Sequence, residues 1–166
     1  MYDTALILCQ TIALALPAAW LTIGVAENIR HPSLNGTITA QVMEMRRMRA
    51  EYPEDFARVA HRAVTAPRLQ RLAFRVVVVA ELVVVVALWA GVLGLAGALV
   101  GGLGASGVSG ARALALIAAT GFTAIWAGFL IGGNYFCYWY CHEGAQNTHY
   151  QMTLWGLGTA IFVAMG

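Results

Sequence analysis

The sequence contains no lysine and little charge of either sign. Charged residues make up 11 % of its 166 residues, whereas an average globular domain has about 25 %. A water-soluble chain of this length needs more charge to cover its surface. Together with a hydrophobic content of 60 %, this scarcity excludes a soluble globular domain and predicts an integral membrane protein in contact with the lipid bilayer.

The basic residues are all arginine, and nine of the ten lie between Arg30 and Arg75. The positive-inside rule places such a segment in the cytoplasm. A net charge of only +2, with the arginines next to apolar runs, argues against nucleic-acid binding. We therefore expect residues 26–72 to form a cytoplasmic loop.

Long apolar runs fill most of the remaining chain. About 20 apolar residues span a bilayer as a helix, and lipid forces the helical form because the backbone finds no other partners there. An even number of spans would place both termini in the periplasm of a bacterial inner membrane, with loops 26–72 and 133–149 in the cytoplasm. The sequence predicts an all-α membrane protein with four transmembrane helices, at about residues 5–25, 74–97, 113–133 and 150–165.

The first apolar run is interpreted as a span, with Asp3 or Thr4 as its N-cap. A cleaved signal peptide is the rival interpretation, but the run lacks a basic region before it and a small-residue cleavage site after it. Between the second and third spans, the glycine-rich residues 101–110 are expected to form an outward-facing link.

The long loop carries two segments with apolar residues at helical spacing. One covers residues 37–49, and the other follows Pro53, where Glu54 and Asp55 suit a first helical turn. Two short basic amphipathic helices on the inner membrane surface fit this pattern, and docking on a partner subunit fits equally well. The apolar positions are Ile38, Val42, Met45 and Met48 in the first segment and Phe56, Val59, Ala60, Ala63 and Val64 in the second.

Small residues recur every four positions within the spans. Such faces allow helix backbones to approach closely in lipid, so we expect a compact bundle. The three sets are Ala87 with Gly91, then Ala124, Gly128 and Gly132, and finally Gly156, Ala160 and Ala164.

Two cysteines and two histidines gather between the third and fourth spans. Cys137 and Cys141 share a face if the helix is continuous, and His142 and His149 follow closely. Zinc sites usually show a two-residue cysteine spacing or two such pairs. We therefore predict no metal or other cofactor and a reduced cysteine pair, with these four residues as the alternative ligand set.

The same stretch carries five aromatic residues, which are typical of a membrane interface. Gly144 is expected to end the third helix, and residues 143–147 to form a tight turn. Thr148 and Gln151 match the capping box, which predicts that Thr148 caps the fourth helix. The aromatic residues are Tyr135, Phe136, Tyr138, Trp139 and Tyr140.

Glu81 is an ionisable residue that lies well inside a predicted span. A carboxylate facing lipid is costly, so its side chain should point into the bundle or toward a partner. We expect it to accept a hydrogen bond from Thr22, Thr153 or Asn134, as a protonated packing contact or as a proton or cation site.

The segment Ile131-Gly132-Gly133-Asn134-Tyr135-Phe136, followed by Trp139 and a polar turn, resembles the bacterial family of predicted small integral membrane proteins. That family has Gly-Gly-Glu-Trp-Phe and, downstream, Trp-Asn-Gly-Gln at the matching places. The stretch 42–45 and Glu81 extend the resemblance over most of the chain. Asn134 replaces the family's glutamate, and residues 145–147 depart from Asn-Gly-Gln. The resemblance implies a four-helix inner-membrane protein and no particular activity.

Three functions are compatible with these features. We predict a non-catalytic accessory, assembly or structural subunit of a larger inner-membrane complex, acting with a membrane-protein partner or as a homo-oligomer. One alternative is a metal- or redox-dependent membrane enzyme using the cysteine and histidine cluster. The other is a small transporter or channel subunit using Glu81. No catalytic residue is predicted, and the polar candidates for a functional contact are Glu81, Asn134 and Glu143.

Overall fold

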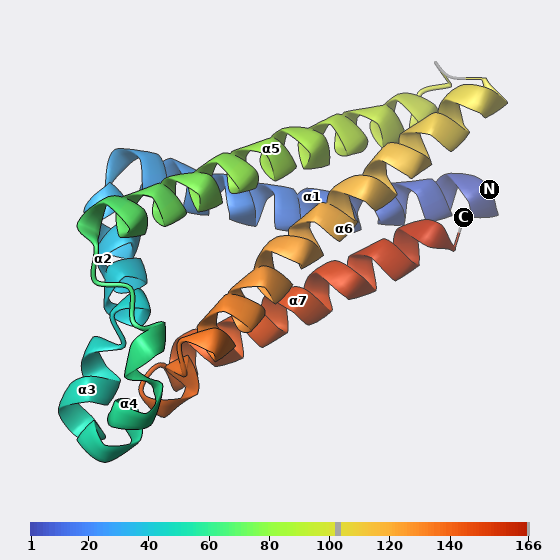
Figure 1. Ribbon diagram of the computed structural model, residues 1–166. Helices are drawn as coiled ribbons and strands as arrows, with labels where there is room; N and C mark the ends of the chain where they lie inside the picture. The colour runs from blue at the N-terminus through green and yellow to red at the C-terminus, as the bar shows by residue number, and fades with distance from the viewer. Residues whose placement is uncertain (102–103, 166) are drawn as a thin grey trace.

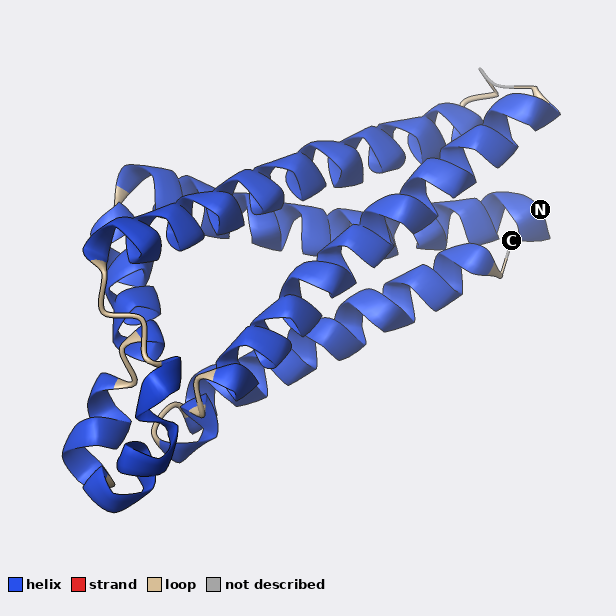
Figure 2. Cartoon of the chain, viewed as in Figure 1, coloured by secondary structure: helices blue, strands red, loops and turns tan. Residues whose placement is uncertain are grey.

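The computed structural model describes residues 1–101 and 104–165. Its described residues are helical with short connections and contain no β-strand (Figure 2). The all-α prediction is therefore confirmed. The elements are α1 (Tyr2–Arg30), α2 (Pro32–Met43), α3 (Arg46–Glu51), α4 (Pro53–Val59), η1 (Ala60–Arg62), α5 (Pro67–Leu99), α6 (Ala105–Tyr135), η2 (Tyr138–Tyr140) and α7 (Glu143–Ala164).

Proline marks the beginning of three helices. Pro32, Pro53 and Pro67 each occupy the first position of α2, α4 and α5, where the missing N–H is not needed and the fixed φ suits a helix. The long helices extend beyond the predicted spans at both ends. No side chain caps α1, so the predicted cap at Asp3 or Thr4 is wrong.

Three helices in the described part of the chain, α1, α5 and α6, are long and apolar enough to cross a membrane. The prediction of four such spans is wrong. The fourth helix, α7, has 22 residues, but its first half contains polar residues that lower its hydropathy. Those polar residues are Glu143, Gln146, Asn147, His149 and Gln151.

Helix α7 lies along α6 and ends beside the beginning of α1 (Figure 1). Gln10 in α1 is fully buried, and its amide nitrogen donates to the carbonyl oxygens of Phe162 and Val163 at 3.0 and 3.2 Å. Packing against α6 and these two bonds therefore hold α7 in the bundle. Both termini lie at the same end of the molecule.

The junction before α6 differs from the predicted link. Helix α6 already begins at Ala105, so residues 105–110 of the predicted glycine-rich link are helical, and residues 102–103 lie outside the described part. At its other end α6 stops at Tyr135, and α7 begins at Glu143. Gly144 thus lies in the first turn of α7 rather than ending α6.

Close helix contacts in the bundle depend on glycine at a few positions. A Cβ on Gly91 of α5 would lie 2.9 Å from Leu14 of α1 and 3.0 Å from the Cα of Ala115 in α6. A Cβ on Gly156 of α7 would lie 2.7 Å from Phe122 of α6. By contrast, among residues 1–101 and 104–165, none outside the adjoining turns of α6 comes within 4 Å of a Cβ on Gly128 or Gly132. Two of the three predicted small-residue faces therefore pack inside the chain, and the α6 face does not.

The arginine-rich unit, residues 32–62 with α2, α3 and α4, folds against the chain itself at the end opposite the termini. The predicted helix over 37–49 breaks at Met45, which has a left-handed φ of 50°. This break turns Met45 and Met48 inward, where they are buried against Cys137. The unit has three short α-helices and the 3-10 helix η1, rather than two helices.

The apolar stripe of the second predicted helix packs on the same cluster. Phe56, Val59 and Ala63 contact it from one side, and the segment 136–141 closes it from the other. The chain's own turn therefore covers part of the predicted stripes, whereas Ile38 of the first stripe remains 49 % exposed.

Candidate functional site

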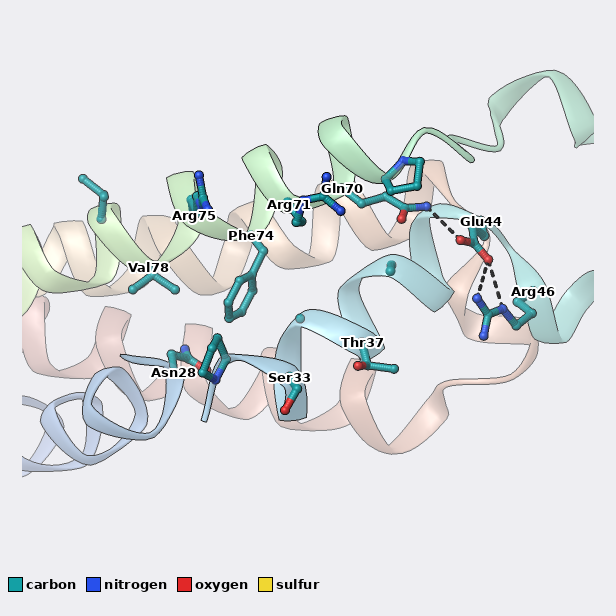
Figure 3. A pocket seen from close by; sticks show the side chains of 15 residues that line it. Asn28, Ser33, Thr37, Glu44, Arg46, Gln70, Arg71, Phe74, Arg75 and Val78 are labelled. Carbon is teal, nitrogen blue, oxygen red and sulfur yellow. Dashed lines mark hydrogen bonds and ion pairs between the residues drawn. The ribbon is translucent and has the colours of Figure 1, made fainter. Parts of the chain in front are cut away.

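A cavity of about 760 Å³ opens at the corner where α1, α2 and α5 meet (Figure 3). Its volume lies within the range of about 300–1,000 Å³ typical of small-molecule sites. The wall from α5 passes from polar to apolar along the helix, and the Phe74 ring projects from α5 toward α2. A Cβ on Gly36 would lie only 3.5 Å from that ring. The lining residues are Asn28, Pro32, Ser33, Gly36, Thr37, Ala40, Glu44, Arg46, Pro67, Gln70, Arg71, Phe74, Arg75, Val78 and Val79.

A polar chain connects this cavity to Glu81 inside the bundle, with Asn28 and Glu81 buried and Asn35 exposed at its outer end. Asn28 donates from Nδ2 to the Glu81 carboxylate at 2.9 Å. Asn35 donates from its own Nδ2 to Asn28 Oδ1 at 2.7 Å. Glu81 is 5 % exposed, so its inward orientation is confirmed.

The predicted partners of Glu81 are wrong. Thr22 donates to the carbonyl of Ala18, and Thr153 to that of His149. Serine and threonine hydroxyls in helices commonly bond four residues back, which removes both as donors to another helix. Asn134 is exposed near the end of α6.

A second polar contact holds the cavity together at its outer edge. Gln70 at the beginning of α5 donates from Nε2 to Glu44 at 3.0 Å and to the Val64 carbonyl at 2.8 Å. Arg46 donates to the other Glu44 oxygen at 2.8 and 2.9 Å. The hydrogen bond from Gln70, and then that from Arg46, holds the pKa of the Glu44 carboxyl below its usual value. These contacts fix the beginning of α5 to the arginine-rich unit.

The two cysteines between α6 and α7 do not share a helix face. Helix α6 ends before them, and Cys137 has a left-handed φ of 54°. Cys137 is buried, with its sulfur 3.8 Å from an Arg62 nitrogen. Cys141 is half-buried, with its sulfur 3.8 Å from a Glu51 carboxylate oxygen. Both thiols are free.

The two histidines lie in different surroundings. His142 precedes α7, where burial, and then the positive charge of Arg47, lowers its pKa. The His149 ring lies inside the bundle among aromatic rings, 5.0 Å from Phe129 and stacked on Tyr138 at 6.0 Å between centroids. Among residues 1–101 and 104–165, no group of three His, Cys, Asp or Glu side chains is placed to hold a metal ion. The predicted alternative ligand set is therefore not brought together.

The aromatic residues of this turn divide into two groups. Tyr135 and Trp139 are 52 % and 39 % exposed, as expected at an interface. Tyr138 is buried inside, and Tyr140 packs in a T-shape on Tyr52, the residue between α3 and α4, with 5.1 Å between ring centroids. An interfacial belt therefore explains only part of the set, since Tyr138 packs on His149 inside the bundle and Tyr140 attaches the arginine-rich unit.

The predicted helix cap at Thr148 is wrong. Thr148 lies inside α7 and donates from its hydroxyl to the carbonyl of Gly144 at 3.0 Å. The predicted turn over residues 143–147 is the helical beginning of α7. Glu143, another predicted polar candidate, is exposed at that beginning.

Sequence reasoning missed Asn28, Asn35 and Gln70. A signal for Asn28 was present, because it continues the buried stripe of Leu21 and Val25 at helical spacing. Ending the first span at residue 25 placed Asn28 in a loop and concealed this relation.

A family model described as predicted small integral membrane protein (DUF2165) matches residues 6–166. The chain belongs to this family. The membership agrees with the three membrane-length helices and establishes an integral membrane protein in contact with lipid. It confirms the resemblance seen in the sequence. No curated protein and no solved structure matches this family member.

Proposed function

We propose that this family member is a non-catalytic accessory subunit of a larger complex in a bacterial inner membrane. The observation that carries the proposal is the open small-residue face of α6. Ala124 and Gly128 are exposed, and no described residue outside the adjoining turns of α6 comes within 4 Å of a Cβ on Gly128 or Gly132. In lipid, such a face favours the close approach of another helix. By contrast, Gly91 of α5 and Gly156 of α7 already have partners within the chain.

The arginine-rich unit supports the same proposal from outside the membrane helices. Its apolar side packs against Cys137, so its charged side faces outward. The side chains of Arg46, Arg47 and Arg58 are 58 %, 48 % and 79 % exposed. Each of these arginines forms an ion pair within the unit, with Glu44, Glu51 and Asp55 respectively. The outward surface therefore carries charges of both signs and suits a polar surface on a partner subunit.

The proposed orientation places the arginine-rich unit and the turn 136–142 in the cytoplasm and both termini in the periplasm. The arginine distribution supports it, as does the contact between the unit and the turn, because segments in direct contact lie on one side of a membrane. The termini lie at the other end of the molecule.

Crosslinking from α6 tests the proposal. A photo-crosslinking residue at position 128 is expected to link one membrane protein in fixed stoichiometry in native membranes. Replacing both Gly128 and Gly132 with Leu should abolish copurification of that protein, with no loss of thermal stability, because both positions are open. Gly158→Leu is the matched control, since Gly158 of α7 is equally open. Crosslinks to lipid alone, or unchanged copurification in the double variant, would contradict the proposal.

The polar chain from the cavity to Glu81 favours a second candidate, a subunit of a proton- or cation-conducting path. Asn28 binds Glu81 and also lines the cavity. Glu81→Gln keeps an acceptor for Asn28 and removes the ionisable group. Conductance in proteoliposomes that Glu81→Gln abolishes would favour this candidate, and the absence of conductance in the unaltered protein would reject it.

A further inference from the structure

We propose that the cavity between α1, α2 and α5 binds the headgroup of an anionic phospholipid, with one acyl chain along the outer surface of α5. The proposal is independent of the accessory-subunit function. It rests on the charge of the cavity, on its change from polar to apolar along α5, and on its position at the arginine-rich end of a membrane helix.

The charge of the cavity is positive and incompletely neutralised. Three arginines line it, together with a single carboxylate, that of Glu44. Glu44 is already occupied by Arg46 and Gln70. Within the described residues, neither Arg71 nor Arg75 has a carboxylate within 4.0 Å.

Arg71 and Arg75 are also held close to each other. Four residues apart on α5, they lie on one face of the helix, where like charges repel each other and destabilise it. An anion between the two guanidinium groups turns this repulsion into attraction. Phosphate suits the site because arginine binds its oxygens in a two-pronged geometry.

The wall of the cavity changes character over a short distance along α5. Arg71 and Arg75 are followed by Val78 and Val79, which also line the cavity. At 1.5 Å per residue, the step from Arg75 to Val79 covers about 6 Å. Val79 is 60 % exposed on a helix long and apolar enough to cross a membrane. A phospholipid has the same polarity sequence, from phosphate through glycerol to hydrocarbon.

The position of the cavity also suits a lipid better than a soluble anion. It lies where α5 passes from the arginine-rich unit into its apolar run. Basic pockets between membrane helices on the cytoplasmic side are typical anionic-lipid sites, with about 1 kcal/mol for each nearby Lys or Arg. That energy corresponds to about a fivefold change in binding per arginine.

The test compares two lipids with identical acyl chains by native mass spectrometry of the purified protein. Phosphatidylglycerol is expected to remain bound at least about tenfold more than phosphatidylcholine, and the preference should weaken at high salt. Arg71→Gln with Arg75→Gln should reduce phosphatidylglycerol retention to the phosphatidylcholine level. Arg71→Lys with Arg75→Lys should retain a preference because the charge is kept.

Arg47→Gln with Arg58→Gln is the matched control. It removes the same charge from α3 and α4, away from the cavity, and should leave the preference unchanged. Equal loss in both double variants would overturn the proposal, because it would indicate a general charge effect. Equal retention of the two lipids by the unaltered protein would overturn it without any variant. Displacement of phosphatidylglycerol by millimolar glycerol phosphate would assign the cavity to a soluble anion instead of a lipid.

Discussion

Asn28 in α1 donates a hydrogen bond of 2.9 Å to the Glu81 carboxylate in α5. Asn28 continues the buried stripe of Leu21 and Val25 in α1, and Glu81 precedes Val85 in the buried stripe of α5. The pair therefore fixes the register between the two helices at the point where their apolar contact ends.

Replacing Asn28 with Ala should destabilise the protein by about 1–3 kcal/mol, because it leaves a buried carboxyl without its donor. Glu81→Gln keeps a carbonyl acceptor and should cost less. Glu81→Leu leaves the Asn28 amide unpaired and should cost more than Gln. Thermal unfolding in one detergent gives the ranking, and a Leu variant as stable as the Gln variant would show that the hydrogen bond contributes little.

Two adjacent glycines at the end of α6 should respond oppositely to alanine. A Cβ on Gly133 would lie 2.7 Å from the Tyr138 ring, whereas one on Gly132 meets nothing within 4 Å. Gly133→Ala is expected to cost about 1–3 kcal/mol through overpacking. Gly132→Ala should be neutral or stabilise by up to about 1 kcal/mol, since alanine favours a helix. Similar melting temperatures for both variants would contradict the packing around Tyr138.

Acid should weaken the contact between α5 and the arginine-rich unit. The folded pKa of Glu44 lies below its ordinary value of 4.5. The contact therefore contributes fully above pH 4.5 and is lost as the pH falls through the folded value. Glu44→Gln should cost about 1 kcal/mol at pH 7 and show a weaker loss of stability below pH 4.5. Parallel stability curves for both proteins would show that Glu44 is not the titrating group.

Cys141 should react slowly with alkylating reagents at neutral pH. Burial, and then the Glu51 carboxylate, raises its pKa, while Arg47 opposes the shift. A raised pKa lowers the thiolate fraction, and the thiolate is the nucleophile. Glu51→Gln should therefore speed alkylation, and Arg47→Gln should slow it. Rates are measured by mass spectrometry of the peptide containing Cys141, and faster alkylation in both variants would indicate increased exposure instead.

Cysteine labelling decides the proposed orientation. With Cys9 and Cys141 replaced by Ser, one new cysteine is placed at Ser33 in α2 or at Ser106 in α6. A membrane-impermeant maleimide should label position 106 in cells with a permeabilised outer membrane, and position 33 only after lysis. The reverse pattern would invert the orientation.

The apolar runs of the sequence were sufficient to place the three membrane helices. Their ends were harder to place, because helical hydrogen bonds continue through polar residues such as Asn28. The predicted cap at Thr148 is wrong for the same reason. Nothing in the short polar stretch 143–149 excludes a helix, and α7 continues through it. The capping-box pattern takes account only of residues close in the sequence, whereas the packing of α7 along α6 determined where the helix begins.

The contacts between segments that lie far apart in the chain could not be predicted from a single sequence. Met45 has a left-handed backbone, which methionine alone does not signal, and it packs against Cys137, which is distant in the sequence. Likewise, Glu81 was identified from its position in a span, but its partner depended on the register between α1 and α5.

The contact between Arg62 and Cys137 joins residues 75 positions apart, which has a consequence for biosynthesis. At about 5–20 residues per second, the ribosome needs roughly 4–15 seconds to reach the turn after α6 once the arginine-rich unit is made. During that interval Met45, Met48 and Phe56 have no partner from the turn. The nascent chain therefore exposes an apolar, arginine-flanked segment until α6 is inserted, which is when a chaperone or a protease would recognise it.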